Sequence, residues 1–364
     1  MTELVPDQLA DRPRVTLADV AAAAHVSTKT VSLALRGDQS VSRETATRIQ
    51  EIAFRLGYVS RGTRRQVIGV VVPYIGHRVY SDLFGFLRRE ASSYEFTMLL
   101  AEGLGEPATE KSLLGELRWR GADGVIMIAP RLAAADIDLA SRLHQPIVTI
   151  GMPTPAGDDL RFARIEIDHE AGGHLATRHL LDHGRSRIAY LAGRLPSASD
   201  QGRRLGYTMA LRAAGIALDE KLIVELERHN VQPWPDYDLG YEQCVQLLSR
   251  DVEIDAILAY SDAIAIGALR AIHDRTRLGV PDELSLVGFD GLTVSQYMIP
   301  KLTSVGVPWY RVALAALEAL IDLMDHDGSA KLGVWRVQSF SPELVLGESV
   351  AAKAASSQLG DVRR

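Results

Sequence analysis

The chain has 364 residues, of which 47% are hydrophobic and 24% are charged, and its formal net charge is −6. This length exceeds what one hydrophobic core usually holds, so we expect two or three globular domains. The single cysteine, Cys244, excludes an intramolecular disulfide framework. The sequence also lacks an apolar run of the roughly 20 residues that a membrane-spanning helix needs.

The N-terminal region is basic, although the chain as a whole is acidic. Residues 1–14 are polar and lack the apolar segment of a secretory signal, so we expect a disordered arm there. Residues 15–65 contain eight basic and four acidic residues, hence a net charge of +4, and the remainder must be acidic. A basic end of this kind suits a polyanion such as DNA.

Residues 15–59 have the pattern of a three-helix domain that contains a helix-turn-helix. Thr16 and Asp19 have the spacing of a capping box, which predicts the start of a first helix. His25–Val26 forms the predicted turn, and Ser27 is a suitable N-cap for a second helix. The pattern predicts a DNA-binding head.

The predicted second helix has one apolar face and one polar face. Val31, Ala34 and Leu35 recur at the spacing of an inward face. Gly37 is suited to the end of this helix, and a third helix is expected from Ser42 to Gly57. The outward face of the second helix consists of Thr28, Lys29, Ser32, Leu33 and Arg36.

From residue 67 onward, short β-branched runs alternate with helical stretches, as in parallel sheets covered by helices on both faces. Strands are expected at residues 67–72, 97–100, 124–128, 146–150, 187–191, 256–260 and 284–287. Helices are expected at residues 83–93, 170–181, 204–214 and 263–273. So many units exceed one sheet of ordinary size, which predicts two lobes with a cleft between them. The predicted fold class is α/β: an all-α helix-turn-helix domain followed by a two-lobed, doubly wound parallel-sheet core.

Together these features resemble the LacI/GalR family of bacterial transcriptional regulators, which have a helix-turn-helix head and a periplasmic-binding-protein-like core. The most specific matching segment is VTLADVAAAAHVSTKTVS at residues 15–32. Matching segments of the core are IDHEAGG at 167–173, GRRLGY at 202–207, AYSDAIAIGAL at 259–269 and LSLVGFD at 284–290. The resemblance implies a core at 67–349 that binds an effector and dimerises, and a flexible tail at 350–364.

The resemblance also implies which residues contact DNA. Thr28, Lys29 and Leu33 match the family's base-reading positions, where Lys29 can donate to guanine and Leu33 can pack on a thymine methyl. Ser27, Thr30 and Ser32 are interpreted as phosphate contacts or caps. The alternative is a solvated helix face. The DNA-binding residues expected in the head are Thr16, Ser27, Thr28, Lys29, Thr30, Ser32, Leu33 and Arg36.

Residues 60–66 form a basic linker that departs from the family's pattern. Family members usually carry a hinge helix with a wedging leucine here, and this chain lacks an evident one. We expect Arg61, Arg64 and Arg65 to contact phosphates or a narrow minor groove. A merely solvated linker is the alternative.

An effector site is expected in the cleft between the lobes. The family's effector-contacting arginine falls on Arg203, and Asp290 falls on an aspartate that can accept hydrogen bonds from two sugar hydroxyls. Ser261 stands where the family commonly has an asparagine, which puts the usual sugar geometry in doubt. Simple packing is the alternative for the aromatic candidates. The expected effector-binding residues are Tyr80, Asp82, Arg203, Trp234, Ser261 and Asp290.

The densest group of histidines includes His179 and His183, which share a helix face at a spacing that could hold a metal. No cysteine flanks them and no HExxH pattern is present, so solvated or capping histidines are the favoured interpretation. No metal and no cofactor are expected.

The sequence therefore predicts a cytoplasmic DNA-binding regulator, a repressor, whose affinity for palindromic operator DNA changes when a sugar-like effector binds. A homodimer is expected through the core, with residues 302–325 in the contact. The alternative is a solute-binding protein of a transport system, which the basic head and the missing signal disfavour. An enzyme is not expected because no nucleotide-binding or nucleophile motif is present.

Overall fold

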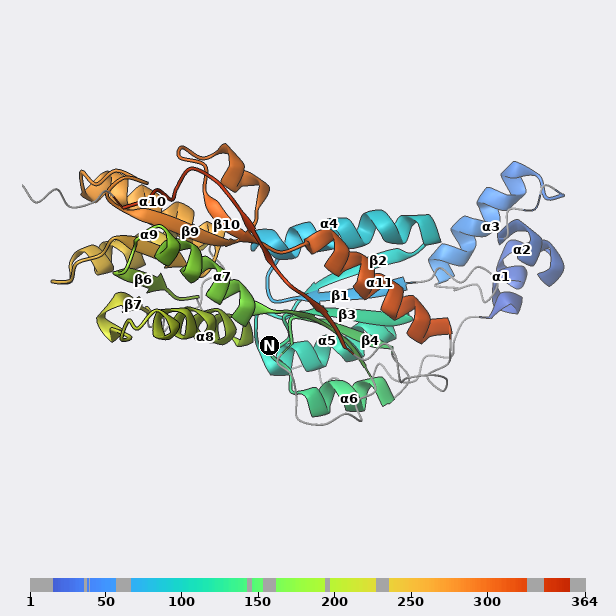
Figure 1. Cartoon of the computed structure of the whole chain (residues 1–364). Helices are drawn as coiled ribbons and strands as arrows, with labels where there is room; N and C mark the ends of the chain where they lie inside the picture. The colour runs from blue at the N-terminus through green and yellow to red at the C-terminus, as the bar shows by residue number, and fades with distance from the viewer. Residues whose placement is uncertain are drawn as a thin grey trace, which may run out of the picture. The chain divides into compact units, whose positions relative to one another are not determined.

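The computed structural model describes residues 16–35, 38, 40–56, 67–142, 146–152, 162–193, 197–226, 236–325 and 337–353. The chain divides into two compact units, Met1–Gln66 and Val67–Arg364 (Figure 1). Each unit is described by itself below. Several residues singled out from the sequence lie outside the described ones, namely Arg36, Gly37, Gly57, Arg61, Arg64, Arg65 and Trp234.

The first unit is a small helical domain with its own apolar core. Its helices are α1 (Leu17–Ala24), α2 (Thr28–Leu35) and α3 (Arg43–Leu56). Thr16 and Asp19 form the predicted capping box, in which the Thr16 amide donates to the Asp19 carboxylate at 2.7 Å. His25 ends α1 in the left-handed conformation (φ 54°), which makes the predicted sharp turn. The buried core consists of Val20, Ala21, Ala24, Val31, Ala34, Ile49 and Ala53.

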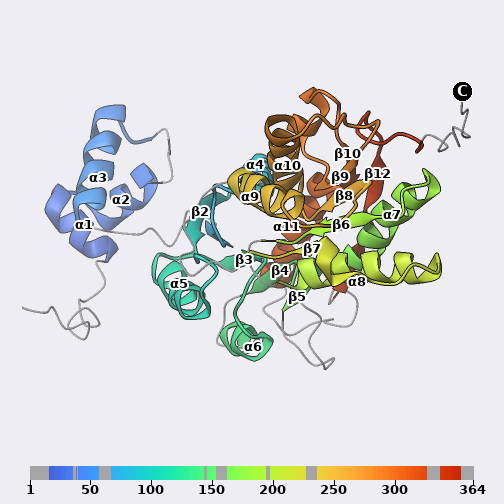
Figure 2. The same ribbon diagram turned by 90° about the vertical axis from the view of Figure 1, so that its left-hand side faces the viewer.

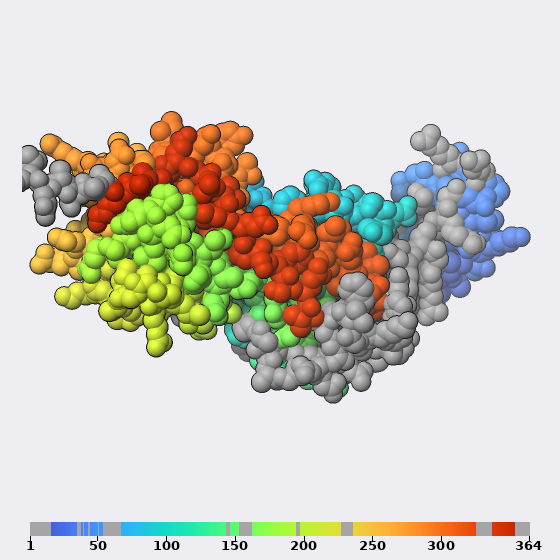
Figure 3. All heavy atoms as spheres, in the orientation of Figure 1, coloured from blue at the N-terminus to red at the C-terminus, as the bar shows by residue number. Residues whose placement is uncertain are grey.

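The second unit has two lobes, each built on a six-stranded sheet. The sheet of the N-lobe has the order β11-β5-β4-β3-β1-β2, and all its strands are parallel. Its strands are β1 (Val67–Val72), β2 (Thr97–Glu102), β3 (Gly124–Ile128), β4 (Ile147–Ile150), β5 (Ala163–Ile167) and β11 (Val337–Phe340). Its helices are α4 (Arg78–Ala91), η2 (Ser92–Tyr94), α5 (Pro107–Trp119), α6 (Ala134–Arg142) and α11 (Trp309–Asp325). Helices α4 and α11 lie side by side on one face, and α5 and α6 cover the other (Figures 1 and 3).

The sheet of the C-lobe has the order β12-β10-β9-β8-β6-β7, and only β12 runs antiparallel to its neighbour. Its strands are β6 (Ile188–Leu191), β7 (Ile223–Val224), β8 (Ala256–Ala259), β9 (Ser285–Asp290), β10 (Thr303–Gly306) and β12 (Glu343–Val345). Its helices are α7 (His169–Asp182), α8 (Ala198–Ala213), η3 (Glu220–Leu222), α9 (Asp236–Leu248), α10 (Asp262–Arg275) and η4 (Thr293–Tyr297). The pairs α7/α8 and α9/α10 pack on opposite faces (Figure 2). The predicted α/β core of two doubly wound sheets is confirmed.

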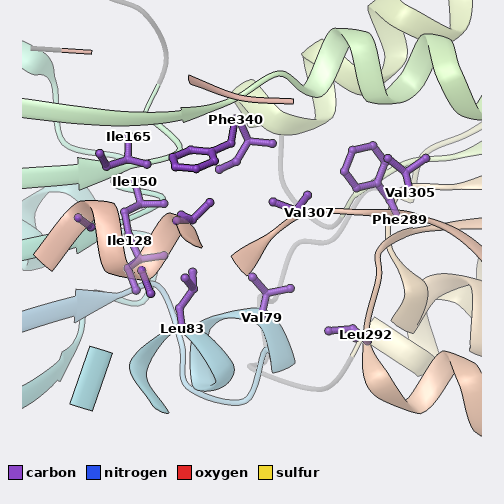
Figure 4. Close-up of a cluster of buried hydrophobic side chains, with 14 of the residues drawn as sticks. Val79, Leu83, Ile128, Ile150, Ile165, Phe289, Leu292, Val305, Val307 and Phe340 are labelled. Atoms are coloured by element: carbon purple, nitrogen blue, oxygen red, sulfur yellow. The ribbon is translucent and has the colours of Figure 1, made fainter. Parts of the chain in front are cut away.

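The described chain passes between the two sheets three times: from β5 to α7, from β10 to α11, and from β11 to β12 (Figure 1). Two of these crossings are joined directly, because the Asp168 amide donates to the Phe340 carbonyl at 3.0 Å. Buried apolar side chains continue from one lobe into the other (Figure 4). The crossings therefore connect the two lobes along one side, which is called the hinge side below.

Each expected strand is present, but two expected helices begin earlier than their apolar patterns indicated. Helix α4 starts at Arg78 rather than residue 83, and α8 starts at Ala198 rather than residue 204. In α8 the reason is Ser197, whose side chain accepts a hydrogen bond from the Asp200 amide at 3.1 Å and caps the helix. The polar first turn that follows carries no apolar periodicity, so it was not recognisable as helix.

Glycines allow α7 and α8 to approach each other unusually closely. A Cβ added at Gly206 would lie 2.0 Å from the Glu170 carbonyl oxygen, and one added at Gly173 would lie 2.1 Å from the Arg203 carbonyl oxygen. These contacts are reciprocal and involve backbone atoms, which cannot swing aside. The close approach holds the start of α7 against the part of α8 that carries Arg203.

Gly206→Ala should therefore destabilise the core by roughly 3 kcal/mol, because α7 and α8 must separate to admit the methyl group. Gly85→Ala is the matched control, since a Cβ at Gly85 of α4 meets nothing within 4 Å. That control should gain roughly 0.5–1 kcal/mol from helix propensity. Urea denaturation measures the free energy of unfolding of the two variants, which should fall in Gly206→Ala and rise in Gly85→Ala. Equal stabilities would contradict the packing argument.

Candidate functional site

The exposed start of α2 is the candidate DNA-reading surface of the first unit. Ser27 caps this helix, because its hydroxyl accepts a hydrogen bond from the Thr30 amide at 3.0 Å and lies 2.8 Å from the Thr30 hydroxyl. Thr28 and Lys29 are exposed in the first turn, and Leu33 is half-buried one turn later. The sequence-predicted base-reading residues thus lie on one side of the helix, with the cap holding its N-terminal end.

Thr16 has a different local role from the residues of α2. Its hydroxyl donates to the Asp19 carboxylate at 2.7 Å, and these bonds lower the pKa of Asp19. Thr16 therefore fixes the start of α1, and a phosphate contact would have to share its hydroxyl with this capping box. Ser32 is half-buried on α2.

Arg203 is the centre of the candidate effector site in the C-lobe. Its side chain is 4% exposed, and its Nη2 donates to the Asp290 carboxylate at 3.2 Å. The Nε atom donates to Nδ1 of His169 at 3.3 Å, and Nη1 donates to the Tyr260 carbonyl. Burial lowers the pKa of His169 well below its usual range, and Arg203 lowers it further. The imidazole is therefore neutral and free to accept at Nδ1.

Two aromatic rings pack against the guanidinium group of Arg203. Its Cζ lies 4.3 Å from the centroid of the Tyr260 ring and 3.6 Å from that of Phe289. Cation–π attraction is strongest in a desolvated setting such as this one. Four segments of the C-lobe thus fix the planar guanidinium in one orientation. A lysine at this position would lose the fork geometry of the guanidinium.

Asp290 ends β9 in a strained conformation. Its φ is 108°, a region that side-chain-bearing residues rarely adopt, and such strain is typical of functional sites. The Trp309 indole Nε1 donates to the Asp290 carbonyl at 2.9 Å, which helps hold this conformation. Burial raises the pKa of the Asp290 carboxyl to about 8, while Arg203 acts to lower it.

Asp262, which was not among the expected effector-binding residues, supports the loop that follows Asp290. Its carboxylate accepts hydrogen bonds from the Leu292 amide at 2.7 Å and from the hydroxyls of Ser295 and Ser304 at 2.8 and 2.6 Å. Burial raises the pKa of Asp262 to about 6, against these hydrogen bonds. Asp262 belongs to the AYSDAIAIGAL segment. It could therefore have been recognised from the match to the family motif, but not from the spacing of apolar residues.

Tyr80 is the predicted effector residue that the N-lobe contributes. Burial raises the pKa of its phenol well above the usual range, and the nearby Tyr260, Asp236 and Asp290 raise it too. These three neighbours belong to the C-lobe, so the Tyr80 phenol of α4 lies within electrostatic range of the Arg203 cluster. Its ring packs 4.6 Å from that of His77. The phenol stays neutral and can donate a hydrogen bond.

Ser261 and Asp82 are occupied by local contacts. The Ser261 hydroxyl is fully buried and accepts a hydrogen bond from the Ile264 amide at 3.2 Å, so it caps α10. The Asp82 carboxylate accepts from Nε of Arg78 at 3.0 Å, one turn earlier on α4. The structure thus brings together Tyr80, Arg203 and Asp290 of the predicted set.

The histidines at the end of α7 act as a cap. His183 follows the last turn, and its Nδ1 lies 2.8 Å from the His179 carbonyl oxygen. In the part of the chain that the structure describes, no group of three or more metal-binding side chains is present. Within that same part, no helix is both long enough and apolar enough to cross a membrane.

A helical DNA-reading head joined to a two-lobed core with a polar cluster between the lobes defines a DNA-binding transcription regulator. Residues 16–61 match the family described as bacterial regulatory proteins, lacI family, and residues 177–350 match a periplasmic binding protein-like domain. The chain is 31% identical to the HTH-type transcriptional regulator AscG of Escherichia coli K12, over 93% of this chain and 98% of that protein. It is 28% identical to catabolite control protein A of Priestia megaterium, over 86% and 93%. The chain therefore belongs to the lacI family.

Solved structures agree with this assignment. A complex of the transcriptional regulator CelR with cellobiose covers 92% of this chain and all of that one, with a TM-score of 0.65 and 28% identity. The Escherichia coli transcriptional repressor ascG covers 79% of this chain and all of that one, with a TM-score of 0.67 and 28% identity. Both solved structures are of transcriptional regulators, and the first of them is a complex with cellobiose.

Proposed function

We propose that this protein is a homodimeric repressor whose affinity for palindromic operator DNA changes when a sugar-like molecule binds beside Arg203 and Asp290. The observation that carries this proposal is a buried arginine–aspartate pair of the C-lobe that lies within electrostatic range of Tyr80 of the N-lobe. A planar donor, a carboxylate acceptor and phenol groups suit a molecule rich in hydroxyls. The cellobiose complex of the related regulator CelR supports the same class of ligand.

The proposed switch works through the relative arrangement of the lobes. A ligand that touches Arg203 and Asp290 on one side and Tyr80 on the other binds best to one arrangement, and it can shift the equilibrium only by that difference in affinity. We propose that residues 15–59 read the DNA, that residues 60–66 connect them to the core at 67–349, and that residues 350–364 form a tail. The DNA-binding role places the protein in the cytoplasm, and we assign it no catalytic activity.

The proposed dimer contact at residues 302–325 has limited apolar surface of its own. Leu302, Val312 and Leu320 are fully buried inside the core. Among the described side chains of α11, Tyr310, Arg311 and Glu318 are exposed and are available for a contact. Sedimentation velocity at micromolar concentration should show a dimer, and a monomer would contradict the reading of a palindrome.

The proposal is tested by selecting binding sites from random DNA with the full chain, followed by a thermal-shift screen of neutral sugars. Selection should enrich a palindrome, and a bound sugar should raise the melting temperature and change the affinity for the selected site. Recovery of unrelated sequences would contradict operator binding. A sugar that stabilises the chain without changing DNA affinity would favour a solute-binding role.

Lys29→Ala should weaken discrimination between the selected site and random DNA by roughly 10- to 100-fold, because one donor to a base edge is worth about 1–3 kcal/mol. Lys221→Ala is the matched control, since Lys221 is an exposed lysine of the C-lobe. Fluorescence anisotropy with both DNAs measures the ratio. Loss of affinity for both DNAs in equal proportion would make Lys29 a phosphate contact instead.

A further inference from the structure

One ion pair joins the two lobes at a distance from the crossings. Nε2 of His77 lies 3.6 Å from Oδ2 of Asp236, and the two side chains are 13% and 3% exposed. His77 precedes the first residue of α4 in the N-lobe, and Asp236 is the first residue of α9 in the C-lobe. This pair is therefore a direct polar contact between the lobes.

The sheet orders place this pair on the side of the cleft opposite the hinge. The crossings leave the N-lobe sheet beside β5 and β11, whereas His77 follows β1, which β3 and β4 separate from β5. In the C-lobe the crossings involve β10 and β12, whereas Asp236 begins the helix between β7 and β8. A contact far from the hinge resists the separation of the two lobes most effectively, because the lobes move furthest apart there when they open.

The surroundings of His77 hold its ring in place for this contact. Its ring lies 4.6 Å from that of Tyr80 and packs edge-on against that of Tyr74 at 5.9 Å. Tyr80 in turn interacts electrostatically with Asp290 and Tyr260. The pair thus borders the candidate effector site, with Tyr80 between the two.

We propose that His77 and Asp236 form a latch that favours the arrangement in which the two lobes touch and that must open to admit an effector. The consequence for effectors rests on the proposed function, but the latch itself depends only on this contact between the two lobes. A polar contact between a histidine and an aspartate that is largely shielded from water contributes more than a solvent-exposed one. Its loss should move the lobes toward open arrangements.

The test measures the distance between the lobes in the full-length protein without DNA or effector. Ala108→Cys in the first turn of α5 and Glu242→Cys in α9 place one exposed spin label on each lobe. The native Cys244 is fully buried, so the labels go to the introduced cysteines. Pulsed electron–electron resonance then gives the distribution of distances between the labels.

Asp236→Asn keeps the shape of the side chain and removes its charge. It should raise the ratio of open to closed molecules on the order of tenfold. His77→Gln should have a similar effect, and the double variant should open no further than either single one, because the two residues act as a pair. Circular dichroism and thermal melting establish that each variant is folded.

Asp238→Asn is the matched control, because Asp238 is an exposed aspartate in the same first turn of α9. It should leave the distance distribution unchanged. An unchanged distribution in Asp236→Asn would overturn the latch, and an equal change in Asp238→Asn would assign the effect to the helix terminus instead. A failure to find an operator or a sugar would count against the proposed function and would leave this measurement intact.

Discussion

Arg203→Ala is expected to abolish the response of DNA binding to the effector while leaving DNA binding itself intact. The head folds around its own core, so it does not need Arg203. In the C-lobe, removal of the guanidinium leaves the Asp290 carboxyl and Nδ1 of His169 without their buried donor. Each buried acceptor left unsatisfied should lower the free energy of unfolding by roughly 1–3 kcal/mol.

The neighbouring Arg204 provides the control for this variant. Its guanidinium pairs with Glu220 and Glu225 on the surface, and its side chain is 34% exposed. Arg204→Ala should cost about 1 kcal/mol or less and should keep the effector response. Urea denaturation measures the stabilities, and anisotropy with selected DNA measures the response. A full response in Arg203→Ala would place the effector elsewhere.

The contribution of Asp290 to the stability of the core should fall as the pH rises from about 4 to about 8. Burial raises the pKa of Asp290 to about 8, whereas an aspartate of the unfolded chain titrates near pH 4. Between these two pH values Asp290 is protonated in the folded state and ionised in the unfolded state. The free energy of unfolding therefore declines as the pH rises. One such group changes the free energy of unfolding by roughly 1.4 kcal/mol per pH unit within the interval.

Asp290→Asn isolates this contribution, because the amide imitates the neutral carboxyl. The variant should lose less stability than the native chain between pH 5 and pH 8.5, with a difference on the order of 2–4 kcal/mol. Asp182→Asn is the control, since that side chain is 61% exposed and pairs with Arg178 on the surface. Chemical denaturation at the two pH values gives the comparison. Parallel pH profiles for native chain and variant would show that Asp290 is ionised throughout.

Both predictions concern a site whose residues are far apart in the sequence. Arg203 and Asp290 are separated by 87 positions, and Arg203 and the Tyr260 carbonyl by 57. The resemblance to a family indicated Arg203 and Asp290, but it could not show that Ser261 is used as a helix cap. Nor could it show that Asp262 supports the loop after Asp290 through three hydrogen bonds.

The sequence by itself determined the features that depend on neighbouring residues. The capping box at Thr16, the turn at His25 and the β-branched strands follow from local backbone preferences and apolar periodicity, so they were predictable. Short or polar elements such as β7, β11 and α9 lack such periodicity and were not predicted. The spacing of apolar residues was therefore sufficient for the class of fold.

Only the tertiary structure decided which polar groups meet. Tyr80 faces the C-lobe cluster because of how the chain crosses between two sheets, and the His77–Asp236 contact depends on the same arrangement. The physical reason is that burial removes water as a competing partner, so each buried polar group requires a specific neighbour. Which neighbour it finds depends on the packing of whole helices and sheets, which local sequence patterns do not encode.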